Sequence, residues 1–206
     1  MCMKKLLIAL CLMTASVMAQ DTEVMNQQQL EYQANSKTNI IGYFRTRYDV
    51  TQDHMLQIKP GLIVERKIGA NVTALVGYYN QTDWSAGKQQ YVNAHRAWTG
   101  ARWIFFRKGN HILESRYLFE TFRYPDRIQV RSRARLWWEL RNHYFVPSAS
   151  YEYLRFQNTN TNRINAMISH HFNRHLTVGA GFELRQIPST MQYDRIPFTL
   201  VRYHIK

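Results

Sequence analysis

Hydrophobic and polar residues alternate with a period of two along most of this chain after its first twenty residues. The stretch 176–185 shows the pattern most clearly. One set of alternate positions is apolar and comprises Leu176, Val178, Ala180, Phe182 and Leu184. The positions between them hold small, polar or ionised residues, namely Thr177, Gly179, Gly181, Glu183 and Arg185. Successive side chains of a β-strand point to opposite faces, so this pattern predicts a strand with one apolar and one polar face.

Eleven segments of this general kind follow one another along the chain. They span 27–36, 40–50, 55–67, 71–82, 91–106, 111–123, 128–141, 147–157, 162–172, 175–186 and 195–205. No long stretch shows the 3.6-residue period of an amphipathic helix. A sheet that faces lipid must close on itself, because unpaired backbone groups at an edge find no partner in hydrocarbon. The sequence therefore predicts an all-β fold, an antiparallel transmembrane β-barrel.

The number of strands depends on the connections between these segments. Single-chain bacterial barrels have an even number of strands, and their short turns lie on the periplasmic side. Short links near 68–70, 108–110 and 173–174 alternate with links that are mostly longer and more polar. This arrangement predicts about ten strands within 40–206, with both ends of the barrel domain on the periplasmic side. Residues 20–39 are then an N-terminal extension, an interior plug, or an extra strand of a pair that would make twelve.

Ionised residues gather on the faces assigned to the barrel interior. The predicted lumen residues are Arg45, Arg47, Arg102, Glu114, Arg116, Glu120, Arg131, Arg133, Arg135, Glu139, Glu152, Arg163, Glu183 and Arg185. Because Arg131, Arg133 and Arg135 share one face, we expect them to pair with Glu114 and Glu120 on the preceding strand. The predicted lumen is either a packed ionic core or a narrow anion path or anionic-ligand pocket.

The N-terminal segment 1–19 has the layout of a cleaved secretory signal peptide. Lys4 and Lys5 precede an apolar run that is shorter than the roughly 20 residues of a spanning helix. Residues 17–19 then approximate the small-residue pattern of a cleavage site. Both cysteines lie within this segment, so the mature chain is expected to hold no disulfide and no cysteine metal ligand.

Lys and Arg number 27 against 14 Asp and Glu, which gives a formal net charge of +13. An excess of this size is typical of proteins that bind nucleic acid or an anionic surface. Export excludes nucleic acid as the expected partner. The expected location is the bacterial outer membrane, and the expected partners are its lipids, lipopolysaccharide, anionic solutes and, during biogenesis, the barrel assembly machinery. The oligomeric state is left open.

An enzymatic alternative is an outer-membrane lipid-modifying enzyme of the acyl hydrolase type. Such barrels use a Ser/His pair near the lipid boundary, and the nearest pair in this chain is His143 with Ser148. The spacing of these two residues matches no compact motif, so the sequence favours a protein that is not an enzyme. His170 and His171 would point to opposite faces of a strand, and His175 follows a turn. We therefore expect no metal site and no cofactor.

Several short motifs occur in order along the chain. They are His95-Arg96-Ala97-Trp98-Thr99, Glu114-Ser115-Arg116-Tyr117-Leu118-Phe119-Glu120-Thr121-Phe122, Arg131-Ser132-Arg133-Ala134-Arg135-Leu136, Tyr151-Glu152-Tyr153, Asn162-Arg163-Ile164-Asn165 and Thr177-Val178-Gly179-Ala180-Gly181-Phe182. This order resembles the bacterial outer-membrane barrels grouped as domain of unknown function 2490, over roughly residues 28–205. Lys206 departs from the terminal aromatic residue usual in barrel proteins.

The resemblance implies an outer-membrane barrel and implies no activity. With the residue pattern, it predicts an outer-membrane protein whose lumen is filled with Arg/Glu pairs. Such a protein is either structural or a narrow pore that favours anions.

Overall fold

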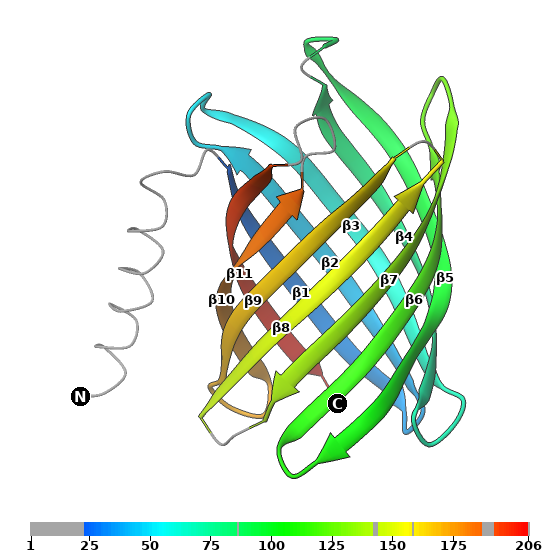
Figure 1. Ribbon diagram of the computed structural model, residues 1–206, viewed down its shortest axis with the longest axis vertical. Helices are drawn as coiled ribbons and strands as arrows, with labels where there is room; N and C mark the ends of the chain where they lie inside the picture. The colour runs from blue at the N-terminus through cyan, green and yellow to red at the C-terminus, as the bar shows by residue number, and fades with distance from the viewer. Residues whose placement is uncertain (1–22, 86, 142–143, 158, 187–191, 206) are drawn as a thin grey trace, which may run out of the picture.

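The computed structural model describes residues 23–85, 87–141, 144–157, 159–186 and 192–205, which form a closed β-barrel (Figure 1). Its strands are β1 (Glu23–Asn35), β2 (Thr38–Asp49), β3 (His54–Lys67), β4 (Val72–Ser85), β5 (Gln90–Lys108), β6 (His111–Arg123), β7 (Ile128–Leu140), β8 (Phe145–Phe156), β9 (Asn160–His171), β10 (Leu176–Gln186) and β11 (Tyr193–Ile205). Each strand pairs antiparallel with the next, and a parallel pair of β1 with β11 closes the barrel. The predicted all-β barrel is confirmed.

The prediction of ten strands is wrong, because the described part of the chain forms eleven. The additional strand is β1, which pairs with β11 from Met25 to Tyr32 and with β2 on its other side. The sequence offers 27–36 as a candidate strand, but the expectation of an even strand number left it outside the predicted barrel of ten. An odd strand number makes the first and last strands parallel. The start of β1 and the end of β11 therefore lie at opposite ends of the barrel. The start of β2 and the end of β11 lie at the same end, which is the arrangement predicted for the span 40–206.

The two ends of the barrel carry different connections. One end, which we call the loop end, holds the β2–β3, β4–β5, β6–β7, β8–β9 and β10–β11 connections and lies uppermost in Figure 1. The opposite end, the turn end, holds the remaining connections and the end of β11. The turn between β5 and β6 has two residues, 109 and 110, and Gly109 adopts a positive φ of 55° there. Glycine takes this conformation without the steric cost that a side chain would add.

Large apolar side chains cover the outer face of the barrel. Leu62, Val76, Trp103, Tyr117 and Ile168 come from five strands, and each is about half exposed. Within each strand these residues alternate with residues that point inward, as the period of two requires. An exposed apolar face that extends over so many strands is unusual for a surface in contact with water.

One wall of the interior is apolar and closely packed. Ile41, Ile63, Leu75, Tyr79, Trp98 and Leu118 form a buried cluster along β2 to β6. The rings of Tyr79 and Trp98 are stacked with centroids 6.1 Å apart. Gly61 and Gly77 make room for them, because an added Cβ would collide with the Tyr79 ring at one position and with the Trp98 ring at the other. This wall fills part of the interior and leaves the rest to charged side chains.

Candidate functional site

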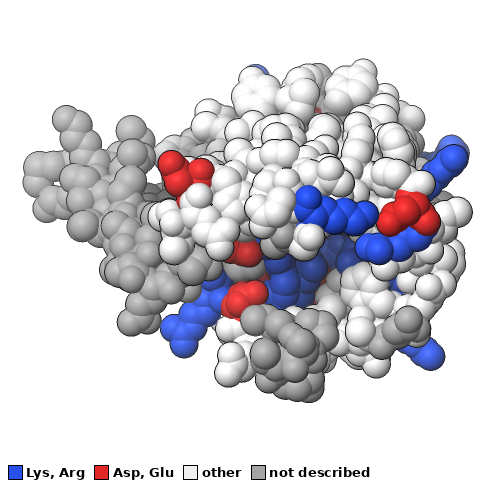
Figure 2. Space-filling model, turned by 90° about the horizontal axis from the view of Figure 1, so that it is seen from above, with Lys and Arg blue, Asp and Glu red and all other residues white. Residues whose placement is uncertain are grey.

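A cavity of about 380 Å³ lies inside the barrel and is lined by residues from all eleven strands. Thirteen cationic residues line it: Arg45, Arg47, Lys59, Arg96, Arg102, Arg116, Arg131, Arg133, Arg135, Arg141, Arg163, Arg185 and Arg202. Four carboxylates line it: Glu114, Glu139, Glu152 and Glu183. Figure 2 shows Lys and Arg side chains gathered in the hollow at the loop end. The cavity is therefore strongly cationic.

The structure places thirteen of the fourteen predicted lumen residues on the lining of this cavity. The remaining one, Glu120, is fully buried beside it and forms ion pairs with arginines of the lining. These side chains share the interior because each occupies an inward position on its own strand. Period-two alternation was the signal that identified them.

Glu120 on β6 is the centre of a buried ionic cluster. Its carboxylate forms ion pairs with Arg96 on β5 and Arg131 on β7, and its Oε1 lies 3.7 Å from Nη1 of Arg133. The guanidinium groups of Arg96 and Arg131 also lie 5.0 and 4.8 Å from the ring of Phe122. Shared ion pairs and cation–π contacts offset part of the cost of burying these charges.

A second cluster forms around Glu152 on β8. Its Oε1 lies 2.5 Å from Nη2 of Arg133 and 3.0 Å from Nε of Arg135. Arg133 therefore bridges Glu120 and Glu152 and joins the two clusters. Both carboxylates are almost completely buried, so the joined clusters are a rigid part of the interior.

Glu114 does not pair with the arginines of β7 in the way that the sequence suggested. Its register partner on β7 is Trp137, and its carboxylate lies 3.9 Å from Arg102 and 4.0 Å from Arg116. The missing partner for Arg135 comes instead from β8, where Glu152 stands directly opposite. The register between strands decided this pairing, and the sequence of one strand does not contain that register.

The register also brings like charges together across neighbouring strands. Arg102, Arg116, Arg135, Glu152, Arg163 and Arg185 are successive register partners from β5 to β10. We call the five arginines of this set the arginine row. On the other wall of the cavity, Arg45 on β2 is the register partner of Lys59 on the neighbouring strand β3. Like charges in directly opposite positions destabilise a sheet.

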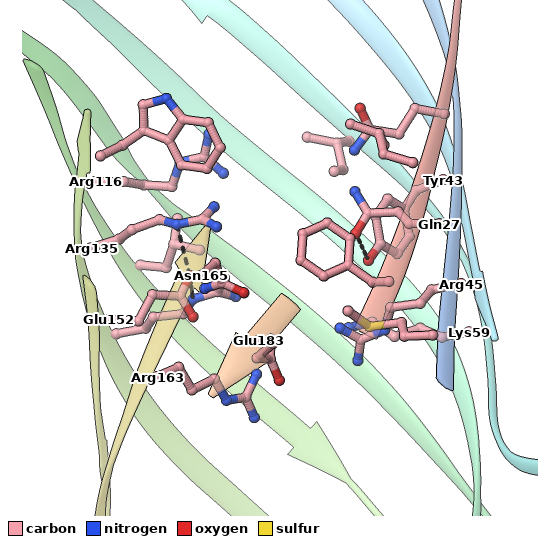
Figure 3. Close-up of a pocket in the computed structure, with 18 of the residues that line it drawn as sticks. Gln27, Tyr43, Arg45, Lys59, Arg116, Arg135, Glu152, Arg163, Asn165 and Glu183 are labelled. Atoms are coloured by element: carbon pink, nitrogen blue, oxygen red, sulfur yellow. Dashed lines mark hydrogen bonds and ion pairs between the residues drawn. The ribbon is translucent and has the colours of Figure 1, made fainter. Parts of the chain in front are cut away.

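Some of these cations make no salt bridge with a described carboxylate. Lys59 is only 3% exposed, and its Nζ lies 4.4 Å from the centroid of the Tyr79 ring. Arg45 donates hydrogen bonds to the neutral amide oxygen of Gln57 at 3.0 and 2.5 Å. The Nε atom of Arg163 is buried and has no acceptor among the described residues. Figure 3 shows Arg45 and Lys59 on one wall of the cavity and Arg163 on the other.

A separate polar cluster lies at the turn end, where β1 meets β11. Oε1 of Glu31 forms an ion pair with Nε of Arg202 at 3.1 Å, and its other oxygen lies 2.9 Å from Nδ1 of His204. Nε2 of His204 lies 3.4 Å from the hydroxyl of Thr177, which also contacts Nδ1 of His171 at 2.8 Å. Glu31, His171 and His204 line a second cavity of about 550 Å³. Sequence reasoning missed this cluster because the favoured barrel of ten strands began at residue 40, and an extra strand within 20–39 was only one of the alternatives.

The three histidines that lie close together in the sequence, His170, His171 and His175, make separate contacts in the structure. His170 packs against the rings of Phe145 and Phe172, whereas the side chain of His171 bonds to Thr177. Nδ1 of His175 contacts the backbone oxygen of His204. Within the described ranges, no three His, Cys, Asp or Glu side chains are grouped in a way that could hold a metal ion.

Of the two residues of the enzymatic alternative, the structure describes Ser148 only. His143 lies outside the described residues. Ser148 is 4% exposed and lines the central cavity, so its hydroxyl faces the barrel interior and not the lipid boundary.

Comparisons with family models and with curated proteins add no relative. No family model matches the chain. No curated protein is significantly similar to it. In the part of the chain that the structure describes, no helix is long and apolar enough to cross a membrane.

The strand order and the lining of the interior define a closed β-barrel with a cationic cavity.

Proposed function

We propose that this protein is an outer-membrane β-barrel whose lumen admits small anions and excludes cations. The observation that carries the proposal is the lining of the central cavity, where thirteen cationic side chains face four carboxylates. Rings of charged side chains in a narrow, poorly solvated passage select for ions of opposite sign. Low-dielectric walls also concentrate the field and raise the local anion concentration.

The outer face supports a membrane location. The shortest strand has 11 residues and the longest 19, whereas about 9–11 tilted residues are enough to cross a bilayer. Exposed aromatic and aliphatic side chains cover the outer surface, as in barrels that face lipid. The predicted signal peptide 1–19 lies outside the described residues and stays part of the proposal. So do the resemblance to domain of unknown function 2490 and the interactions with lipopolysaccharide and the assembly machinery.

Location is tested by fractionation and by heat-modifiability. The protein should separate with the outer membrane. Unboiled protein should migrate differently from boiled protein on a gel, because a closed hydrogen-bonded barrel resists unfolding in mild detergent. Recovery as a soluble periplasmic protein would overturn the proposed location.

Selectivity is tested in a planar bilayer with a potassium chloride gradient. The sign of the reversal potential should show anion preference, and Arg163→Glu should weaken that preference. Arg155→Glu is the matched control, because Arg155 is an exposed cation on an outward position of β8. A barrel that conducts no ions, or that prefers potassium, would contradict the proposal and support a purely structural role for the ionic interior.

A further inference from the structure

We infer that the central cavity is a binding site for a small organic molecule with an acidic group at each end. The inference rests on the proposed function, since it names the class of anion that the lumen admits. One acidic group would be held by Arg45 and Lys59, and the other by the arginine row at Arg163. Figure 3 shows these two groups of cations facing each other across the cavity.

The first pole of this site is built around Lys59. An ammonium group that is 3% exposed and makes no salt bridge with a described carboxylate is expensive to keep charged. Its contacts with the rings of Tyr79 and Tyr43, at 4.4 and 5.7 Å, supply only part of the lost hydration. Arg45 is its register partner on β2, and among the described residues Arg45 donates its side-chain hydrogen bonds to the neutral amide of Gln57. Together they offer an anionic ligand two donors from adjacent strands.

The second pole lies on the arginine row. Among its members, Arg163 makes no salt bridge with a described residue, and the Nε atoms of Arg102, Arg116 and Arg163 are buried without a hydrogen-bond acceptor among the described residues. Arg135 and Arg185 have carboxylate partners at 3.0 and 2.5 Å, so they are partly neutralised. A carboxylate or phosphate oxygen fits the planar fork of Arg163 in the geometry that guanidinium groups prefer.

Without such a ligand, the arginine row lowers the stability of the sheet. Five arginines and one glutamate occupy register-paired positions on six successive strands, where like charges weaken the sheet. A chain that carries an unfavourable local arrangement does so most often at a functional site. Two separated poles favour a ligand with two acidic ends over one with a single acidic end. Binding of the first end places the second end at a high effective concentration near the other pole.

Two tryptophans allow the inference to be tested without conductance. Trp98 and Trp137 both line the cavity, so a ligand that enters should change the fluorescence of folded protein in detergent. Succinate carries a carboxylate at each end, butyrate carries one, and glycerol 3-phosphate carries two charges at one end. At equal ionic strength, succinate should bind at least about tenfold more tightly than either control ligand, since bivalent attachment adds a large factor.

Variants of the two poles distinguish binding at this site from non-specific attraction of anions to a positively charged protein. Lys59→Met and Arg163→Met should each weaken succinate binding by about tenfold and leave butyrate almost unaffected. Lys59→Arg keeps the charge and should restore most of the affinity. Arg66→Met is the control, because Arg66 is exposed on β3 outside the cavity lining. Heat-modifiability shows whether each variant is folded, and Arg163→Met serves as the test if Lys59→Met is not.

The outcomes distinguish this inference from the proposed function. Anion-selective conductance with equal affinity for all three ligands would overturn the two-ended site and leave the proposed function standing. Tight succinate binding by a barrel that conducts no anions would support the site and overturn the passage. An unchanged affinity in folded Arg163→Met would show that the second pole is assigned wrongly.

Discussion

Replacement of Glu120 by glutamine tests whether the interior is held together by its buried ion pairs. Glu120 is completely inaccessible to solvent and forms ion pairs with Arg96, Arg131 and Arg133 from two neighbouring strands. Glutamine preserves the shape of the side chain but removes its charge. The three arginines would then lose one carboxylate partner. For Arg96 and Arg131, this is the partner that compensates the burial of their charges.

The magnitude follows from this burial. Removing one partner of a buried ion pair costs about 3–5 kcal/mol, because the remaining charge is left without compensation. For a chain of this size, 1 kcal/mol corresponds to about 2–4 °C in the midpoint of thermal unfolding. Glu120→Gln should therefore lower the midpoint by about 6–20 °C. The temperature at which the folded band disappears from an unboiled gel measures this change.

The matched control is Glu139→Gln. Glu139 pairs with Arg141 at 2.6 Å, but the side chain of Arg141 is 64% exposed. An exposed pair contributes at most about 1 kcal/mol, so the control should shift the midpoint by no more than about 4 °C. Equal midpoints for the two variants would refute the reasoning, because they would show that water screens Glu120 as fully as it screens Glu139.

Three further predictions concern the contact between β1 and β11, the apolar wall and the lumen charge. Glu31→Gln removes the carboxylate that joins β1 to Arg202 and His204 of β11, and it should lower the thermal midpoint by less than Glu120→Gln because these side chains are partly exposed. Gly77→Val should displace the Trp98 ring, cost about 1–3 kcal/mol and alter tryptophan fluorescence. The same change at Gly87, where an added Cβ meets nothing within 4 Å, should do neither. Anion preference in the bilayer should decline from 0.1 M to 1 M salt, as the screening length falls from about 10 to about 3 Å; a constant preference would point to selection by size instead of charge.

The inward or outward direction of side chains could be predicted from the sequence. Arg131, Arg133 and Arg135 line the cavity because alternate positions of one strand share a face. The same rule placed Glu183 and Arg185 inside, and it applied without knowledge of the neighbouring strands. The same rule marks 27–36 as a candidate strand, and it was the expectation of an even strand number that left β1 outside the predicted barrel of ten.

By itself, then, the sequence determined the β-structure and the face on which each charge lies, because both follow from a local period of two. The tertiary structure alone decided the closure of β1 on β11, the strand number and the pairing of Glu152 with Arg135. It also decided that Arg163 stands beside Arg185, and that Lys59 is buried without a carboxylate partner among the described residues. These features depend on the register and order of strands distant in the chain, which the alternation within one strand does not contain.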